Sequence, residues 1–240
     1  MPDQLTIGLL GGTGPLGRGL ALRLALAGHR VLLGSRDRQK AEAIVADLLG
    51  GRHLPIEGTA NQDAAERAEV VFLAFPYAGQ AQVLPGLARA VEGKVVVDVV
   101  NPLGWDEAGP LMLDVPEGSA AEQAQSLLPG ARVVAAFHHA APRLLGDLDR
   151  QVETDVLVAG DDESAKALVI ELADQIPGCR GVDAGALRQA RYLEGFTAVV
   201  VGVNRRYKIH AGVRVARLGD ERRRRFNADL RPAGAREEGS

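Results

Sequence analysis

The N-terminal part of the chain alternates between short apolar runs and stretches with helical spacing of apolar residues. One run covers 5–10 and a second covers 30–34. Between them, apolar positions recur at near-helical spacing up to Gly28, a residue type that often ends helices. A further helix is predicted over 37–49. Because short continuous apolar runs are typical of strands buried on both faces, this pattern predicts the opening of a doubly wound sheet.

The same alternation continues along the chain to about residue 184. Six more strands are expected, at 53–56, 70–75, 95–100, 131–137, 156–159 and 180–184. Further helices are expected at 61–67, at 78–90, from 119 onward and at 164–176. The prediction is therefore an α/β, Rossmann-type fold with a doubly wound, mostly parallel sheet and a small C-terminal helical segment that completes the pocket.

Three local signals qualify these elements. Asn61 is a possible N-cap for the helix that follows it. Pro85 lies inside the predicted helix over 78–90, so that helix is broken or starts late. Residues 103–118 hold several glycines and prolines and the only tryptophan. A loop of this length is either a lid or binding loop, or a plain surface insertion.

The C-terminal part of the chain is less regular. Three consecutive valines at 199–201 favour a strand within 186–206, whereas the leucines and the length of that segment favour a helix. Apolar residues on many sides of 193–203 predict burial in a two-fold interface, with burial inside one chain as the alternative. Residues 219–240, which include four consecutive arginines, are predicted to be a disordered, solvated tail rather than a contact for RNA or acidic lipid.

Composition and charge exclude several classes of protein. The net charge of −3 gives no overall basic field to recruit nucleic acid or anionic lipid. No apolar run reaches the roughly 18–20 residues of a membrane span, and the first residues lack the basic segment of a signal peptide. The single cysteine, Cys179, excludes a disulfide framework and a Cys-rich zinc site, and it fits a reducing cytoplasm.

A glycine-rich turn, G-x-G-x-x-G, follows the first strand and opens the first helix. Gly12 permits the tight turn, Gly14 lets a pyrophosphate approach the backbone, and Gly17 lets helix and strand pack closely. The helix N-terminus offers unpaired N–H groups to the phosphates. This context predicts a dinucleotide site within a cofactor domain over 1–184, followed by a small part over 185–218 with pocket and dimer contacts. A bare structural turn is the alternative.

The end of the second strand indicates which dinucleotide binds. NAD sites usually carry an acidic residue there, but this chain has Gly34-Ser35-Arg36. Ser35 can donate a hydrogen bond, Arg36 can form a planar charge-assisted pair, and Lys40 lies one helical turn further on. These residues predict NADP. The alternative is a solvated basic start of a helix.

Three short groups follow directly after predicted strands: Phe75-Pro76-Tyr77, Asn101-Pro102 and His138-His139. In open α/β sheets that edge lines the ligand crevice. Either histidine could orient a substrate or a cofactor amide, or serve as a proton donor; a supporting or surface role is the alternative. No metal triad, Ser–His–Asp order or Y-x-x-x-K pair is visible in the sequence, which favours chemistry that needs little acid–base help.

The motifs resemble one known family. The run TIGLLGGTGPLGRGLA over 6–21 resembles the start of the NADPH-dependent coenzyme F420 reductases, also called F420H2:NADP oxidoreductases. Gly34-Ser35-Arg36 matches the family's next motif. Four later motifs, at 136–139, 160–164, 182–185 and 204–212, resemble the bacterial members. The resemblance runs from residue 5 to about 218, and the later motifs in this order are the more specific ones.

The resemblance implies hydride transfer between the nicotinamide C4 of NADP and C5 of an 8-hydroxy-5-deazaflavin, in a homodimer. It implies that NADP is held by Thr13, Gly14, Pro15, Leu16, Ser35, Arg36 and Lys40. It places the nicotinamide beside Phe75, Pro76, Tyr77 and the Asn101-Pro102 region, and the deazaflavin near His138 and His139. Tyr77 stands where archaeal members carry Trp, and 219–240 goes beyond the family pattern.

Two other functions remain open at this point. One is an NADP-dependent reductase of the same fold with another acceptor, such as a cyclic imine, a ferric chelate or a flavin. The other is a non-catalytic module that senses NADPH. Hydride transfer between two bound rings depends above all on proximity and orientation. The lack of an evident general acid in the sequence therefore agrees with hydride transfer between NADP and a deazaflavin.

Overall fold

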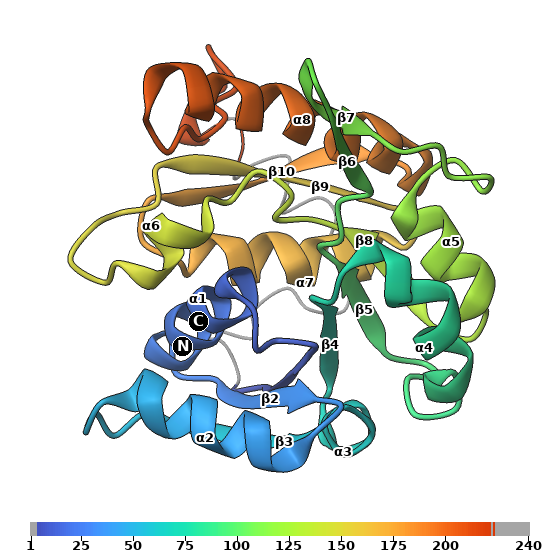
Figure 1. The fold of residues 1–240 in the computed structure, drawn as a ribbon, viewed down its shortest axis with the longest axis vertical. Helices are drawn as coiled ribbons and strands as arrows, with labels where there is room; N and C mark the ends of the chain where they lie inside the picture. The colour runs from blue at the N-terminus through green and yellow to red at the C-terminus, as the bar shows by residue number, and fades with distance from the viewer. Residues whose placement is uncertain (1–3, 222, 224–240) are drawn as a thin grey trace, which may run out of the picture.

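A twisted sheet of eight strands lies at the centre of the computed structural model, which describes residues 4–221 and 223 (Figure 1). The strands in spatial order are β10 (Cys179–Gly185), β9 (Thr154–Gly160), β8 (Arg132–Ala135), β5 (Val95–Asp98), β4 (Val70–Leu73), β1 (Thr6–Leu10), β2 (Arg30–Ser35) and β3 (Ile56–Ala60). Only β8 and β9 pair antiparallel among the neighbours in this sheet. The prediction of a Rossmann-type, mostly parallel sheet is confirmed.

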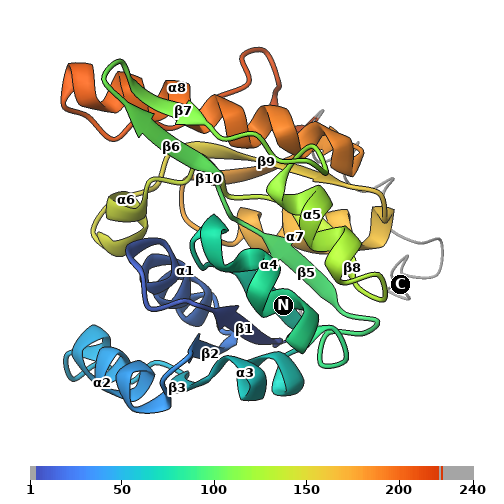
Figure 2. The same cartoon turned by 45° about the vertical axis from the view of Figure 1, so that its right-hand side comes forward.

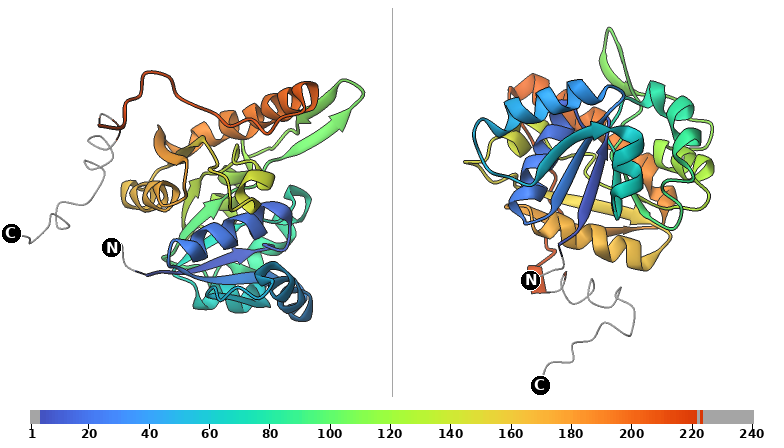
Figure 3. Two further views of the ribbon diagram at one scale, coloured as in Figure 1. Left: turned by 90° about the vertical axis from the view of Figure 1, so that its left-hand side faces the viewer. Right: turned by 90° about the horizontal axis from the view of Figure 1, so that it is seen from below.

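Helices cover both faces of the sheet and bury two separate hydrophobic clusters (Figure 3). Apolar residues of α1 (Pro15–Leu26), α2 (Arg38–Leu49), α6 (Pro142–Gly146) and α7 (Glu163–Asp174) pack in one cluster. Residues of α3 (Asn61–Arg67), α4 (Gln80–Leu87), α5 (Ala120–Leu127) and α8 (Ala190–Tyr207) pack in the other. The sequence explains where several helices begin, because Asp37, Ser119 and Asp162 each accept a hydrogen bond from an amide in the first turn of α2, α5 and α7.

The segment after β5 is not the structureless loop that the sequence suggested. It forms an antiparallel hairpin of β6 (Leu103–Asp106) and β7 (Gly109–Met112), with Asp106 accepting hydrogen bonds from the amides of its turn. Gly109 has a φ of 129°, which a residue with a side chain rarely adopts. The hairpin extends beside α8 (Figure 2). The Arg205 guanidinium of α8 lies 5.0 Å from the centre of the Trp105 ring of the hairpin.

Other element boundaries differ from the expectations. β3 begins at Ile56, where the predicted strand over 53–56 ends. The helix that contains Pro85 starts late, at Gln80, after a single 3₁₀ turn at Tyr77–Gly79. The ambiguous segment 186–206 is a 3₁₀ turn at Leu187–Gln189 followed by α8, so the strand propensity of its valines is overridden by helical packing.

The C-terminal segment is tied to the outer strands. Asp155, whose side chain is fully buried, pairs with Arg180 and Arg214 and accepts a hydrogen bond from the Val215 amide. Arg223 is buried against Asp174 at 2.7 Å. The start of the predicted solvated tail is therefore anchored on the sheet edge, while residues 222 and 224–240 lie outside the described part of the chain. A bilayer-spanning helix is not found in the part of the chain that the structure describes.

Candidate functional site

The glycine turn between β1 and α1 leaves open space for a ligand. The Gly12 amide is within 3.1 Å of the carbonyls of Leu9 and Gly34, and a side chain on Gly17 would collide with the Gly12 backbone. Gly14, in contrast, has no atom of the described residues within 4 Å of the position where its Cβ would stand. It is also the N-cap of α1 and supplies no capping side chain. The first-turn amides are thus directed at free space, as a pyrophosphate site requires.

A cavity of about 590 Å³ lies beside this turn, at the carboxyl ends of β1, β2 and β4. It is lined by Gly11, Thr13, Ser35, Arg36, Asp37, Lys40, Asn61, Phe75, Pro76, Ala78, Gly79 and Val83. The sheet order reverses between β4, β1 and β2, and open α/β sheets bind ligands at such a switch point. Six residues that the sequence singled out for NADP therefore share one cavity. The other residues singled out for NADP and the deazaflavin do not line it: Gly12, Gly14, Pro15, Leu16 and Gly17 of the adjoining turn, Tyr77, Asn101, Pro102 and the two histidines.

The end of β2 carries the charged side of the cavity. Arg36 and Lys40 are exposed, and Ser35 is buried with its Oγ accepting a hydrogen bond from the Asp37 amide at 3.2 Å. Sequence reasoning overlooked that Asp37 also lines the cavity. Its carboxylate caps α2 by accepting from the Lys40 amide at 3.2 Å. The Asp37 carboxylate is thus hydrogen-bonded to the first turn of α2, whereas the exposed side chains of Arg36 and Lys40 are accessible to an anionic group.

Asn61 was assigned the wrong role from sequence. The N-cap of α3 is Ala60, and no side chain caps that helix. The Asn61 Oδ1 instead accepts a hydrogen bond from the Gly11 amide at 2.9 Å. A Cβ at Gly34 would lie 2.7 Å from the same oxygen, so Gly34 makes room for it. Asn61 therefore joins the ends of β1 and β2 at the cavity, and no sequence motif indicates this contact.

The groups after β5 and β8 meet at a second place along the same sheet edge. The Asn101 Nδ2 donates to the His138 carbonyl at 3.4 Å, and Pro102 is buried. Phe137, just before the histidines, has a φ of 62°, which turns the chain sharply at the end of β8. The sequence prediction that these two groups lie at one edge is borne out, although a ligand-binding role for them stays a prediction.

Both histidines are buried and held in their neutral forms. Burial lowers the pKa of His138 to about 3, with repulsion from His139 as a further cause, and burial also lowers the pKa of His139. The His139 Nε2 lies 2.8 Å from the Leu193 carbonyl and therefore donates to it, which leaves Nδ1 as an acceptor. The ring meets Phe196 edge-on at 5.4 Å between centres. An imidazolium at either position is disfavoured, so proton donation by a charged histidine is not supported.

A second hollow lies between the β7 end and α8. Its volume is about 760 Å³, and it is mostly apolar, with Met112, Leu113, Val115, Tyr192, Phe196 and Val199 among its lining residues. Phe196 connects this hollow to His139. The sequence indicates the apolar character of 193–203, but nothing in it indicates that this segment lies against the end of the hairpin.

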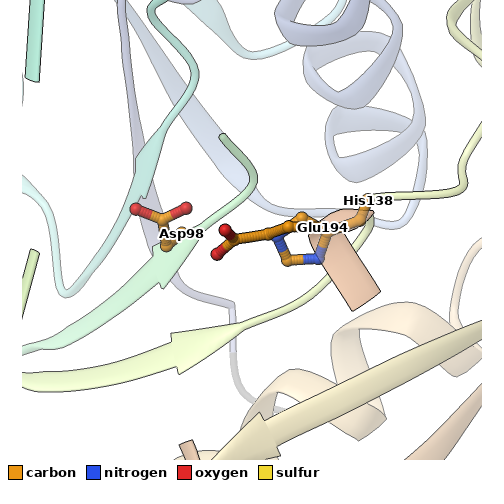
Figure 4. A group of neighbouring side chains, drawn as sticks. All are labelled: Asp98, His138 and Glu194. Carbon is orange, nitrogen blue, oxygen red and sulfur yellow. The ribbon is translucent and has the colours of Figure 1, made fainter. Parts of the chain in front are cut away.

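Two buried acids near the histidines were also missed. Asp98 ends β5 and Glu194 lies on α8, and both side chains approach His138 (Figure 4). The signal was available in the sequence, because Asp98 closes the run VVVD and Glu194 interrupts an apolar helix. A carboxyl group in such a position is rarely buried without a specific partner.

Comparisons with known proteins agree with this geometry. Residues 6–102 match the family described as NADP oxidoreductase, coenzyme F420-dependent. The chain is 38% identical over 222 residues to an F420-dependent NADP reductase of Methanocaldococcus jannaschii. This alignment covers 89% of the chain and 99% of the relative. It is 39% identical over 222 residues, with the same coverage, to an F420-dependent NADP reductase of Methanothermobacter marburgensis.

A solved structure shares the fold. A putative F420-dependent NADP reductase from Arthrobacter sp. FB24 superposes with a TM-score of 0.78 at 29% identity, covering 89% of this chain and all of that one. The identity to the archaeal proteins extends over nearly their whole length, beyond the cofactor turn and through α8. The chain therefore belongs to the family of F420-dependent NADP reductases.

Proposed function

We propose that this protein is an oxidoreductase that transfers a hydride between the nicotinamide C4 of NADP(H) and C5 of the 8-hydroxy-5-deazaflavin coenzyme F420. One observation carries the proposal. The cavity at the switch point combines the uncapped N-terminus of α1 with Ser35, Arg36 and Lys40, which suit a dinucleotide bearing a 2′-phosphate. The relatives that match along their whole length are named F420-dependent NADP reductases, which supports the choice of acceptor.

The residues divide into four roles in this proposal. Thr13, Gly14, Pro15 and Leu16, between Gly12 and Gly17, hold the pyrophosphate, while Ser35, Arg36 and Lys40 hold the 2′-phosphate. The nicotinamide lies against Phe75, Pro76, Tyr77, Asn101 and Pro102. His138 and His139 orient the deazaflavin. The neutral state of both rings agrees with orientation rather than with proton donation.

The two cofactors supply the redox chemistry, and the protein aligns them. Direct hydride transfer requires the donor and acceptor carbons in contact and the exclusion of water. Apolar and aromatic side chains on both hollows, such as Phe75 and Phe196, serve that purpose. The protein needs no metal ion for this reaction, because the hydride moves between two organic rings.

We also propose a homodimer located in the cytoplasm, with the cofactor domain over 1–184 and a small pocket-completing part over 185–218. The dimer is supported by exposed apolar side chains on α8, and the cytoplasmic location by the single cysteine, Cys179, which is free and buried. The cofactor domain then holds NADP, while α8 and its partner helix close the deazaflavin side.

The test is a spectroscopic assay of the purified protein with NADPH and F420. Bleaching of the deazaflavin absorbance band, with matching oxidation of NADPH, is the expected result. Turnover of NADPH only with a cyclic imine, a ferric chelate or a flavin would establish the alternative reductase instead. Tight NADPH binding without turnover of any acceptor would indicate the sensing module.

A further inference from the structure

Three ionisable side chains are buried together behind the edge where the two cofactors are proposed to meet. Asp98 and Glu194 are fully buried and His138 is 5% exposed. One potential ligand atom from each lies within 4.8 Å of the others. Figure 4 shows the Glu194 carboxyl group directed toward Asp98, with the His138 ring beside it. Water cannot reach this place to stabilise two adjacent negative charges.

The hydrogen bonds of the two acids are unequal. The Glu194 oxygens accept from the Ala120 amide at 2.9 Å and the Ala121 amide at 3.1 Å, at the start of α5. The Asp98 Oδ1 accepts from the Val100 amide at 2.9 Å. Among the described residues, the Asp98 Oδ2 and both ring nitrogens of His138 have no hydrogen-bond partner of good geometry. Glu194 is therefore well solvated by backbone amides, whereas Asp98 keeps one oxygen without a partner among the described residues.

We propose that above neutral pH Asp98 and Glu194 share one proton, which Asp98 carries as a neutral carboxylic acid while Glu194 remains the carboxylate, and that this acid pair positions the wall of the hydride-transfer pocket. The proposal concerns positioning residues and rests on the proposed function for its catalytic consequence. The proton assignment itself depends only on the fold.

The surroundings decide which acid is charged. Glu194 has two charge-assisted hydrogen bonds and the positive end of the α5 dipole, whereas Asp98 has one amide. The other charged group facing Glu194 is Glu122, which pairs with Arg191 at 3.3 Å. Burial raises the pKa of Asp98 well above its usual value, with the Glu194 charge as a further cause, and burial raises the pKa of Glu194 to about 7. The neutral His138 and His139 add no positive charge.

A metal ion fits the cluster less well than a proton. Both oxygens of Glu194 and the Asp98 Oδ1 already accept backbone hydrogen bonds. Among the described residues, the Asp98 Oδ2 and the His138 ring are the uncommitted groups of the cluster. One ring gives a single nitrogen to one ion, so the cluster offers two free ligands, fewer than the three or four protein ligands of a typical zinc site. A single proton on Asp98 gives the free oxygen a role as a hydrogen-bond donor and needs no further ligands.

The acid pair is placed to control the pocket wall. Asp98 is followed by the Val99–Pro102 segment, and Asn101 donates to the His138 carbonyl at 3.4 Å. Thr197 of α8, one turn after Glu194, contacts the same carbonyl at 3.4 Å. Loss of the shared proton would put two charges in a dry site and drive β5 away from α8. The Asn101-Pro102 wall and the histidines would then move apart.

The direct test compares the pH dependence of unfolding in the wild type and in Asp98→Asn. Both acids have a folded pKa above their unfolded values of about 4, so the folded state holds extra protons and stability falls as pH rises. Each extra proton raises the unfolding equilibrium constant tenfold per pH unit. Asparagine keeps the hydrogen-bond donor but cannot titrate. Above the unfolded carboxyl pKa of about 4 we expect Asp98→Asn to remove one such tenfold factor, until Asp98 itself titrates in the folded wild type. The exposed control Asp149→Asn should leave the slope unchanged.

A second measurement uses kcat/KM for F420. The alkaline fall in kcat/KM should move to higher pH in Asp98→Asn, and Asp98→Leu, which has no donor, should show at least a tenfold loss that Asn rescues. Three results would each overturn the proposal: a pH dependence of stability in Asp98→Asn equal to that of the wild type, equal losses of kcat/KM in Asp98→Asn and Asp98→Leu, or a stoichiometric divalent metal in the purified protein.

If the variants fail to fold, the protons taken up or released when the wild type unfolds at two pH values give the number of extra protons in the folded state. If the pH dependence of unfolding changes as expected but the protein has no activity toward F420, the shared proton stands and only the proposed function is refuted.

Discussion

The Oδ1 atom of Asn61 lies 2.9 Å from the backbone nitrogen of Gly11, fifty residues earlier in the chain, and accepts its hydrogen bond. This bond ties the start of α3 to the glycine turn after β1. The same oxygen lies against Gly34 at the end of β2. One amide side chain thus holds together the two strand ends that form the adenosine side of the proposed NADP site.

Replacing Asn61 with Ala should weaken NADPH and NADH binding about equally. The Gly11 amide would lose its acceptor, and a hydrogen bond of this kind contributes about 0.5–1.5 kcal/mol, or roughly 2- to 10-fold in affinity. Titration calorimetry with both nucleotides measures the effect. The control is Gln62→Ala, because Gln62 is the exposed neighbour and its side chain bonds to Glu66 rather than to the glycine turn. A loss confined to NADPH would contradict the positioning role.

Arg36→Ala should instead discriminate between the two nucleotides. A hydrogen bond to a charged group contributes about 1.5–3 kcal/mol, so NADPH binding should weaken roughly 10- to 150-fold while NADH binding hardly changes. Arg36→Lys should recover only part of the loss, since an ammonium lacks the planar fork. The preference should shrink as salt rises, because Arg36 is exposed.

Arg38→Ala is the matched control for Arg36, because Arg38 is an exposed arginine only two residues further on, at the start of α2, but pairs with Asp63. The decisive quantity is the NADPH/NADH ratio of kcat/KM. A wild-type ratio near one, or a ratio that Arg36→Ala leaves unchanged, would show that the assignment of this end of the cavity is wrong.

The sequence predicted the parts of the fold that depend on local pattern. Continuous apolar runs such as Val70–Leu73 are buried strands, and the glycine turn determines where α1 begins, so both could be recognised without tertiary information. The hairpin at 103–112 could not, because its glycines and prolines indicate turns and its register depends on packing against α8. The valines of α8 likewise favour a strand until the packing of Leu193 and Val200 is known.

The candidate site was predicted only in part for a similar reason. Thr13, Ser35, Arg36 and Lys40 stand at fixed offsets from the first two strands, and they line one cavity as expected. Asn61 meets Gly11 across 50 residues, and Asp98 meets His138 and Glu194 from a distant part of the chain, so no spacing in the sequence encodes those contacts. A buried acid in an apolar run was the one available signal, and it indicates a constraint without naming the partner.

His139→Ala should impair deazaflavin binding more than NADPH binding. The ring lies between the Leu193 carbonyl and Phe196, beside the apolar hollow on α8 and away from the NADP cavity. We expect the KM for F420 to rise roughly 2- to 10-fold, the range for one neutral hydrogen bond, with the NADPH dissociation constant nearly unchanged. The control is His29→Ala, since His29 is equally buried but bonds to Gln175. Equal damage to both affinities would indicate a structural role.

Cys179 should be inert in the folded protein. Burial raises the pKa of its thiol to about 12, so the thiolate fraction at pH 8 is about a thousandfold lower than for a free cysteine. Alkylation followed by mass spectrometry should show no modification of the native protein at pH 8 and complete modification in denaturant. Rapid labelling of the native state would show that β10 opens, or that the thiol has a function that the fold does not explain.

Val199→Asp should convert the proposed dimer to a monomer. Leu193 and Val200 of α8 are buried within the chain, whereas Tyr192, Phe196 and Val199 are 66%, 44% and 55% exposed. Burial inside one chain therefore accounts for only one side of this helix. The exposed side continues into the hollow beside β7, which makes a contiguous apolar surface that a monomer would leave in water.

A charge at the centre of such an interface is costly, so sedimentation at micromolar concentration should give a dimer for the wild type and a monomer for Val199→Asp. Leu26→Asp is the control, because Leu26 is 53% exposed on α1, which belongs to the opposite face of the sheet. A monomeric wild type, or a dimer that survives Val199→Asp, would exclude this surface. Because Phe196 touches both His139 and the hollow, the monomer should also lose affinity for F420 while keeping its affinity for NADPH. Loss of NADPH binding as well would mean that the substitution had disturbed the sheet rather than the interface.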